Sequence, residues 1–238
     1  MKINFNYIKG ILLLAAIAFL FLFAEKRNSK RVPGPVNLAF TNSENLYVTE
    51  KAVNKLLIQN YAAVQGEGKE PLDLNEVESL LDAHKMIENA EVFLSINGQL
   101  GAIITQRKPI ARVMAPEPYY IDRQGVKMPL SPYHSARVPL VRGIKEENLK
   151  EVFPLLDFIV NDGFLSRQVI GVQRKSHGVY QFQIRETDFV VILGKIKDLE
   201  RKFKNFKAFY KQALKDKKLK AYKKVNLRFG NQVVCTKK

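Results

Sequence analysis

The sequence predicts an α+β protein that begins with a transmembrane helix and continues as two folded parts. Three observations lead to this fold class: an unbroken apolar run near the N-terminus, a strand–helix–helix–strand–strand order after it, and a strand-rich remainder with flanking helices. Hydrophobic residues make up 46% of the 238 residues, which is enough to fill one or two cores. The expected divisions are a tail over residues 1–7, an anchor over 8–24, a linker over 25–35, a first domain over 36–108 and a mixed β domain over 109–238.

The apolar run spans Ile11–Ala24 without a polar residue. Together with Tyr7 and Ile8 it reaches the short end of the length that a helix needs to cross a bilayer. A cleaved signal peptide is the competing interpretation, because its apolar core has a similar length. However, the run ends in Leu22-Phe23-Ala24, which places a large residue where a cleavage site needs a small one. The sequence therefore favours an uncleaved anchor.

The charges around the anchor bear on its orientation. Lys2 and Lys9 precede the apolar run, whereas Lys26, Arg27, Lys30 and Arg31 follow it, offset by Glu25. Because cytoplasmic flanks carry the excess of Lys and Arg, this count places the C-terminal bulk in the cytoplasm. The rule is statistical, and the first helix of a protein does not always follow it.

The first domain is predicted from the change of hydrophobic period along the chain. A linker at Val32–Pro35 stops the anchor helix, because its prolines and glycine break a helix. The expected elements are a strand at 36–40, helices at 48–61 and 73–84, and strands at 90–96 and 100–104. Asn97-Gly98 separates the last two strands and is a strong hairpin signal, because both turn positions need a positive φ. The order is therefore strand, helix, helix, strand, strand.

The second domain is predicted to be mostly β-structure. Strands are expected at 119–121, 126–128, 138–142, 168–174, 179–185, 189–193 and 227–236, with a helix at 148–161 and a long basic helix at 195–224. The final strand, Leu227–Thr236, raises a question about pairing. A terminal strand pairs on one side with its own sheet, and its other side can expose N–H and C=O groups to another chain.

The net charge of +16 is concentrated near the C-terminus, because residues 195–238 hold 16 Lys and Arg against 3 Asp and Glu. Such a field attracts acidic partners, anionic lipid or nucleic acid. A solvated basic helix face explains the same charge without any partner. Nucleic-acid binding is disfavoured, because the aromatic residues of the basic helix lie at core spacing and form no stacking platform.

No catalytic or metal-binding pattern is present in the sequence. His84, His134 and His177 do not lie at metal-ligand spacing from one another or from Cys235, the single cysteine. No phosphate-binding loop and no nucleophile elbow occur. Asp122 precedes a turn glycine and is expected to bind local backbone N–H groups. We therefore expect no enzymatic activity, no cofactor, no metal and no small-molecule substrate.

Specific motifs resemble a known family. The element order after a single span resembles a POTRA domain, and Glu91–Val113 carries a strand, an Asn-Gly turn, a strand ending in Gln-Arg-x-Pro, and then Ile-Ala-Arg. This stretch is similar to the FtsQ/DivIB family of cell-division proteins. Three further stretches agree: Tyr119–Gly125 resembles the family's aromatic-(I/L)-D-x-x-G turn, Val138–Gly143 its (L/V)-P-x-(I/V)-x-G strand, and Asn226–Phe229 its D-L-R-aromatic strand. The departures are a very short cytoplasmic tail, an added loop at Gly66–Pro71 and no long tail after the last strand.

The resemblance implies a non-enzymatic, single-pass protein of the inner membrane, with its bulk on the periplasmic side and a place at the division septum. Its implied partners are FtsB-like and FtsL-like coiled-coil membrane proteins and other divisome proteins, through which it is linked to septal peptidoglycan synthesis. In the family, the last strand region of the β domain receives a strand from FtsB. The binding residues implied here are Tyr222, Leu227, Phe229, Asn231, Gln232, Val233, Val234 and Cys235.

Core packing is the alternative role for these side chains, and for Leu227 the sequence favours it. Two rival functions also remain at this point. A POTRA-type periplasmic adaptor outside cell division would share the first domain without using the terminal strand. A basic protein facing the cytoplasm, binding anionic lipid or nucleic acid, would follow the charge count around the anchor.

Overall fold

The computed structural model describes residues 5–29, 37–41, 47–64, 73–95, 99–230 and 232–238. It divides into two compact units, one formed by residues 1–45 and 49–105 and the other by residues 46–48 and 106–238. The domain limits expected from the sequence stay predictions, because contacts between residues do not show which parts of the chain fold independently. The expected Asn97-Gly98 turn, the linker at Val32–Pro35 and the added loop at Gly66–Pro71 lie outside the described residues.

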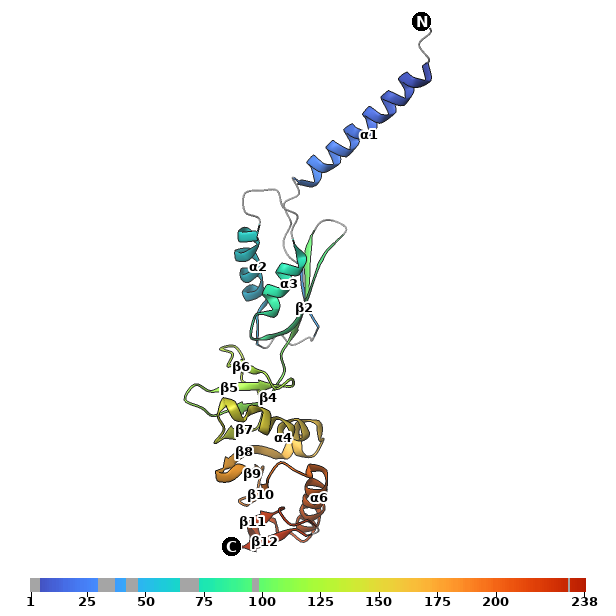
Figure 1. Cartoon of the computed structure of the whole chain (residues 1–238). Coiled ribbons are helices and arrows are strands. Elements are labelled where there is room, and N and C mark those ends of the chain that lie inside the picture. The colour runs from blue at the N-terminus through green and yellow to red at the C-terminus, as the bar shows by residue number, and fades with distance from the viewer. Residues whose placement is uncertain (1–4, 30–36, 42–46, 65–72, 96–98, 231) are drawn as a thin grey trace. The chain divides into compact units, whose positions relative to one another are not determined.

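The N-terminal helix α1 spans Phe5–Ser29 (Figure 1). Large apolar side chains are exposed along it, from Ile11 at 68% to Phe23 at 54%. Within the part of the chain that the structure describes, no helix is both long enough and apolar enough to cross a membrane. The mixed α+β class is confirmed, and the transmembrane assignment stays a prediction.

The first unit contains a three-stranded sheet and two helices. Their bounds are β1 (Asn37–Phe40), α2 (Glu50–Val64), α3 (Leu74–Asp82), β2 (Ile87–Leu94) and β3 (Leu100–Gln106). The strand order is β1-β3-β2, and β1 runs parallel to β3. Asp73 begins α3 as an N-cap, because its side chain accepts a hydrogen bond from the Asn75 N–H at 2.9 Å. These elements follow the predicted order.

Apolar side chains at helical spacing hold this unit together. Val53 and Leu57 of α2 and Val77 and Leu81 of α3 are buried, as are the alternate residues Leu100, Ala102 and Ile104 of β3. The two periods therefore meet in one core, with the helices on one face of the sheet.

The second unit is built on a nine-stranded sheet. Its strands are β4 (Pro109–Val113), β5 (Tyr119–Asp122), β6 (Lys127–Pro129), β7 (Leu140–Arg142), β8 (Val169–Lys175), β9 (Val179–Ile184), β10 (Val190–Gly194), β11 (Tyr222–Asn226) and β12 (Val234–Lys237). Its helices are α4 (Leu149–Asn161), α5 (Leu165–Gln168) and α6 (Leu199–Lys215), with short 3₁₀ turns at 146–148, 176–178 and 219–221. The strand order is β12-β11-β10-β9-β8-β7-β4-β5-β6.

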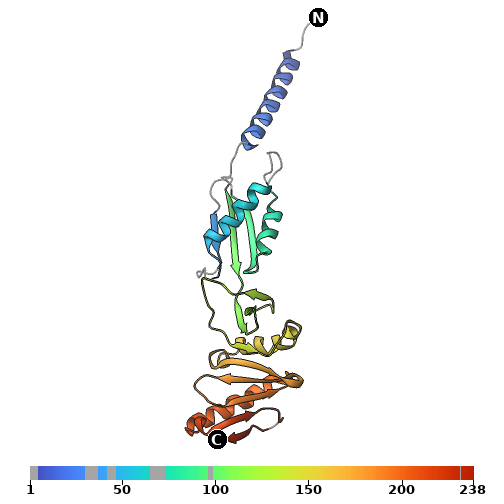
Figure 2. The same ribbon diagram turned by 90° about the vertical axis from the view of Figure 1, so that its left-hand side faces the viewer.

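Two parallel crossovers explain why the helices share one face of this sheet. β7 pairs with β8 in parallel after α4, and β10 pairs with β11 in parallel after α6. Both crossovers step towards β12 between strands that run in the same direction. Since such connections are right-handed, both helices must lie on the same side. Figures 1 and 2 show this arrangement.

The core of the second unit lies between this sheet face and the two helices. Phe203 and Phe206 of α6 are at most 1% exposed and pack on the Phe182 ring of β9, with ring centroids 5.5 and 5.3 Å apart. Leu155 and Leu156 of α4 belong to the same buried cluster. The crossover helices are therefore part of the core and not appendages to it.

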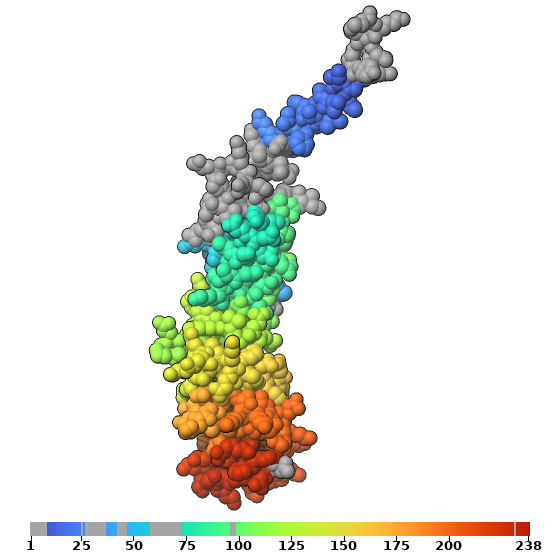
Figure 3. All heavy atoms as spheres, viewed as in Figure 1, coloured from blue at the N-terminus to red at the C-terminus, as the bar shows by residue number. Residues whose placement is uncertain are grey.

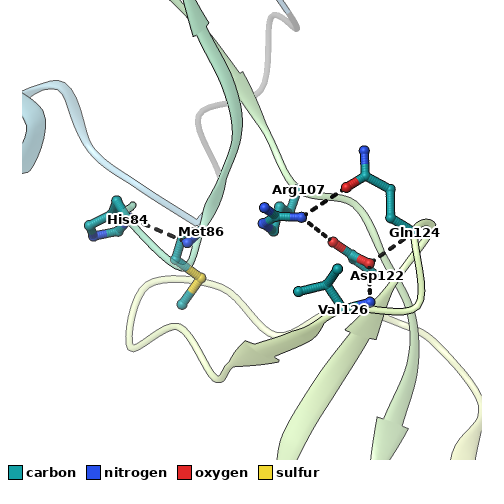
Figure 4. A network of polar contacts seen from close by, with 6 residues as sticks. All are labelled: His84, Met86, Arg107, Asp122, Gln124 and Val126. Atoms are coloured by element: carbon teal, nitrogen blue, oxygen red, sulfur yellow. Dashed lines mark hydrogen bonds and ion pairs between the residues drawn. The ribbon is translucent and has the colours of Figure 1, made fainter. Parts of the chain in front are cut away.

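A buried carboxylate organises the turn between β5 and β6 (Figure 4). Asp122 is 1% exposed, and its Oδ1 accepts from the N–H groups of Gln124 and Val126 at 2.9 and 2.7 Å. Its Oδ2 is 2.7 Å from the Arg107 guanidinium. Each Asp122 oxygen therefore has a structural partner, and the predicted turn role is consistent with the geometry.

The C-terminal region differs from the prediction in two ways. α6 ends at Lys215, and the expected basic helix up to residue 224 is wrong beyond that point. Lys217 has a φ of 53°, and the Lys218 N–H donates to the Ala213 carbonyl at 2.8 Å, which together close the helix. A lysine takes the left-handed position where glycine is usual, so the sequence carried no stop signal.

The predicted strand Leu227–Thr236 is wrong before Val234, where β12 begins. A separate strand, β11, precedes Leu227 and begins at Tyr222, within the expected helix. The Leu227 N–H donates to the Ile192 carbonyl of β10 at 2.8 Å, which continues the parallel ladder for one more residue. Leu227 is therefore buried beside β10, whereas Phe229, the next apolar residue of the pattern, is exposed and lies in no strand.

Candidate strand-binding edge

β12 is the last strand of the nine-stranded sheet, and among the described strands it pairs only with β11. The pairing is antiparallel, with Asn226 opposite Val234, Val225 opposite Cys235 and Lys224 opposite Thr236. In Figure 3 the atoms of this segment, in red, lie at the surface of the second unit. The terminal strand predicted at a sheet edge is therefore present, although it is shorter than expected.

The register shows which backbone groups of β12 face away from the sheet. Leu227 directs its N–H at β10, so the alternate residues of β11, Lys224 and Asn226, direct theirs at β12. Their partners Val234 and Thr236 therefore face β11. By the same alternation, the N–H and C=O groups of Cys235 and Lys237 point away from the sheet. The edge thus offers a short ladder for one added strand.

The side chains of β12 divide between the two faces of the sheet. Val233 and Cys235 are half-buried and pack against the core of the second unit, on the face that α6 covers. Burial raises the pKa of the Cys235 thiol. Val234 is 40% exposed and lies on the opposite face, next to the exposed Thr236. The face without helices therefore presents the side chains that a partner can reach most readily.

The other predicted binding residues lie on both sides of the turn before β12. Tyr222 begins β11, where its ring contacts the Phe209 ring of α6 at 5.3 Å. Leu227 is 2% exposed and belongs to the core, as the packing alternative predicted. Phe229 is 45% exposed and Gln232 is also exposed, whereas Asn231 lies outside the described residues. The predicted set therefore mixes core residues with accessible ones.

The turn between β11 and β12 is held by contacts that the sequence did not indicate. The Asn226 Oδ1 accepts from the N–H and the Nε of Arg228 at 3.1 and 3.2 Å. The Arg228 side chain lies over Gly194, where an added Cβ would come within 2.8 Å of it. Asn205 of α6 donates to the Gly230 carbonyl at 3.4 Å. These contacts leave Phe229 exposed at the start of the edge.

Lys238 follows β12 and binds two other segments of the second unit. Its N–H donates to the Ala221 carbonyl at 3.0 Å, and its Nζ lies 2.8 Å from the Asp188 carboxylate. The hydrogen bond and positive charge of Lys238 lower the pKa of Asp188 below its ordinary value. This exposed pair holds the strand end against the loop between β9 and β10.

The opposite edge of the sheet is obstructed. β6 has only three residues and ends in Pro129, which has no N–H to donate. Lys127 forms an ion pair with Glu146, and its Nζ lies 4.8 Å from the centre of the Tyr119 ring. Short length, proline and lysine all discourage pairing with another chain. Of the two edges of this sheet, β12 is therefore the accessible one.

Lysines surround the accessible edge. Lys204, Lys211 and Lys215 are exposed on α6, and Lys223 and Lys224 are exposed on β11. Lys207 is different, because it forms an ion pair with the partly buried Asp162. Most of the positive charge near β12 is therefore free to act on an approaching partner.

Within the described part of the chain, no group of three or more His, Cys, Asp or Glu side chains is placed to hold a metal ion. His84 lies in the turn after α3, where its Nδ1 accepts from the Met86 N–H at 3.3 Å (Figure 4). His177 is exposed in the turn between β8 and β9 with a φ of 58°. His134 packs its ring edge-on against Tyr47, with centroids 5.3 Å apart. A turn or a ring contact therefore accounts for the position of each histidine.

Together these features define an α+β protein whose larger sheet ends in an open strand edge beside a basic surface. The family model described as FtsQ/DivIB, C-terminal related, matches residues 108–236, which is more than half of the chain. The chain therefore belongs to the FtsQ/DivIB family, as its motifs predicted. Proteins of this family are in general non-enzymatic and act in cell division together with other division proteins. A search of curated proteins finds no match to the chain.

Proposed function

We propose that this protein is a single-pass membrane scaffold of the division machinery that binds a partner through β12. An extended segment of the partner adds to the sheet beside β12 and extends it by one strand. The protein performs no chemistry itself. It connects other divisome proteins to septal peptidoglycan synthesis, and its partners are coiled-coil membrane proteins of the FtsB and FtsL kind.

The observation that carries this proposal is the open edge of β12 within the family-matched region. Outward-facing backbone groups at Cys235 and Lys237 supply main-chain hydrogen bonds to an added strand. The exposed Val234 side chain supplies an apolar contact on the helix-free side, and Phe229 is exposed in the turn before β12. The obstructed β6 edge gives the sheet a single direction of growth.

The lysines near the edge suit a partner that carries acidic residues beside its strand. Lys223 and Lys224 lie on β11, the strand next to β12, so they are close to where that partner would dock. Complementary charge mainly speeds association and selects the register. The partner class proposed here is therefore an acidic, strand-forming segment next to a coiled coil.

We also propose that α1 anchors the protein in the inner membrane, with both units on the periplasmic side at the septum. The support is the apolar run Ile11–Ala24, whose described large side chains lie exposed on a helix. The count of positive charges around the run favours the opposite orientation. A reporter that is active only outside the cytoplasm, fused after Lys238, decides between them. Activity of a cytoplasmic reporter instead would favour a basic protein that faces anionic lipid or nucleic acid.

Photo-crosslinking in cells tests the binding site. Val234 is the better probe position, because its side chain is exposed whereas Val233 packs against the core. We expect crosslinks to one small coiled-coil membrane protein, identified by mass spectrometry. Crosslinks only from probes in the first unit would show that β12 merely closes the fold.

A proline substitution tests whether main-chain pairing carries the affinity. Cys235→Pro removes an N–H that faces away from β11, so it spares the internal ladder and blocks the added one. Cys235→Ala is the matched control, because it trims the same side chain and keeps the N–H. We expect the Pro variant to bind about tenfold more weakly than the Ala variant. Equal affinities of the two variants would exclude pairing at this position.

A further inference from the structure

The first unit also has an edge strand, β2, and two carboxylates bind its outward-facing N–H groups. β2 is an edge strand, since the order of the three-stranded sheet is β1-β3-β2. The Ser95 N–H, just after β2, donates to the Gln99 carbonyl across the hairpin at 2.8 Å. Because backbone groups alternate along a strand, the N–H groups of Ala90 and Val92 face away from β3.

Side chains of α3 bind both of these outward groups. The Ala90 N–H donates to the Asp82 Oδ1 at 2.7 Å, and the Val92 N–H donates to the Glu78 Oε2 at 3.4 Å. Asp82 and Glu78 are four residues apart, which places them on one face of the helix. Ala90 and Val92 are two residues apart, which is the spacing of successive outward groups on a strand. The helical and strand periods therefore match along this edge.

This strand is one that needs protection. Phe93 is 45% exposed and Leu94 is 52% exposed at the end of β2. The Phe93 ring covers Gly101 of β3, where an added Cβ would come within 2.5 Å of the ring. An exposed edge strand with large apolar side chains pairs readily with another copy of itself.

We propose that Asp82 and Glu78 prevent another chain from adding a strand to the β2 edge. An added strand would have to offer its carbonyl oxygens to the outward N–H groups of β2. The carboxylate oxygens of Asp82 and Glu78 already occupy these N–H groups. The occupant that this device excludes is the β2 strand of a second copy of the chain. Strand addition is thereby restricted to other edges of the protein. This inference does not depend on the function proposed for β12.

Hydrogen exchange of the wild-type full chain in mild detergent gives the first test. We expect the amides of Ala90 and Val92 to exchange roughly two- to tenfold more slowly than the amide of Leu94, which faces the same side beyond the two carboxylates. Equal exchange at the three positions would overturn the proposal. This test needs no variant, so misfolding cannot obscure it.

Variants give the second test. In the double variant Glu78→Ala with Asp82→Ala, a photo-crosslinking residue at Leu94 is expected to join two copies of the chain. The same probe should give no dimer in the otherwise wild-type chain, or in Glu78→Gln with Asp82→Asn, which keeps the acceptor oxygens. Glu76→Ala removes an exposed acid from the first turn of α3 and serves as the control for charge.

The outcomes separate clearly. Dimers in the double alanine variant alone support the closed edge. If Ala90 and Val92 exchange faster in the double alanine variant but no dimers form, the edge cannot accept a strand, and the proposal is overturned. Dimers in the Glu76→Ala control would assign the effect to charge and would also overturn it. Crosslinking from Val234 reports on β12 separately, so failure of one proposal is not mistaken for failure of the other.

Discussion

At the scale of single residues, two carboxylates and one glycine occupy positions where their residue type is needed. Asp122 is buried with all its partners supplied by one turn and Arg107. Gly143 adopts a φ of +73°, and an added Cβ would come within 2.4 Å of the Arg174 carbonyl oxygen. Asp162 caps the chain before α5 and binds Lys207. Each of these positions permits a test in which one side chain is changed.

Gly143→Ala should destabilise the second unit by about 2 kcal/mol or more, because a left-handed backbone and a backbone contact both oppose the new Cβ. Gly163→Ala is the matched control, since no atom lies within 4 Å of its added Cβ. Chemical denaturation measures both. A loss for Gly143→Ala no larger than that for Gly163→Ala would contradict the geometry.

Asp162 should contribute stability that depends on pH. Burial tends to raise the pKa of Asp162, but hydrogen bonds from Lys207 and from the N–H groups of Leu165 and Phe164 lower it overall. The contribution is therefore present above the ordinary pKa of 3.8 and is lost as the pH falls through the lower pKa of the folded state.

The comparison of wild type with Asp162→Ala measures that contribution. At neutral pH we expect a loss of about 1 kcal/mol, because a cap and a charge-assisted bond are removed. The difference in free energy of unfolding should shrink as the pH falls below 3.8. A difference that stays constant through this range would show that the ionised carboxylate is not involved.

At the scale of elements, the crossover helix α6 decides how the C-terminal strands are placed. Its Phe203 and Phe206 fill the space over β9, and its length brings the chain back parallel to β10 as β11. β12 can then only pair on the outer side of β11. The open edge is thus a consequence of how α6 packs.

Phe206→Ala should therefore cost about 3–5 kcal/mol of the free energy of unfolding, since Phe206 is fully buried. Leu214→Ala on the same helix should cost less than about 0.5 kcal/mol, because Leu214 is 56% exposed. Thermal and chemical denaturation provide the comparison. Similar losses for the two variants would mean that α6 does not pack as described.

At the scale of the whole molecule, charge is distributed unequally along the chain. The net charge is +16, and residues 195–238 account for +13 of it. This excess lies on α6, β11 and β12 and on the segments that flank them. A field of this kind acts over about 10 Å at moderate salt, which is further than direct contacts reach.

Association with an acidic partner segment should therefore slow as salt is raised. We expect the association rate to fall about tenfold or more from low to high salt, with a smaller change in the dissociation rate. Stopped-flow mixing with a labelled partner segment measures both rates. An association rate that is independent of salt would remove electrostatic steering from the proposed mechanism.

The sequence by itself determined the class of fold, the order of most elements and the family. Alternating and helical periods are local properties, so β1, α2, α3, β3, β8, β9 and β10 could be predicted from neighbouring residues. The presence of a strand at the C-terminal edge was also predictable. Among the expected binding residues, core packing was the favoured role for Leu227, and Leu227 is buried.

Tertiary structure alone decided the rest. The sequence of β11 contains two lysines and predicts helix up to residue 224. It forms a strand because it pairs in parallel with β10. Which groups of β12 face outward depends on its register with β11, which no local pattern encodes. The closure of β2 requires Asp82 and Glu78 to meet residues up to fourteen positions away. Pairing partners and exposed edges are non-local, so they emerge only when distant segments come together.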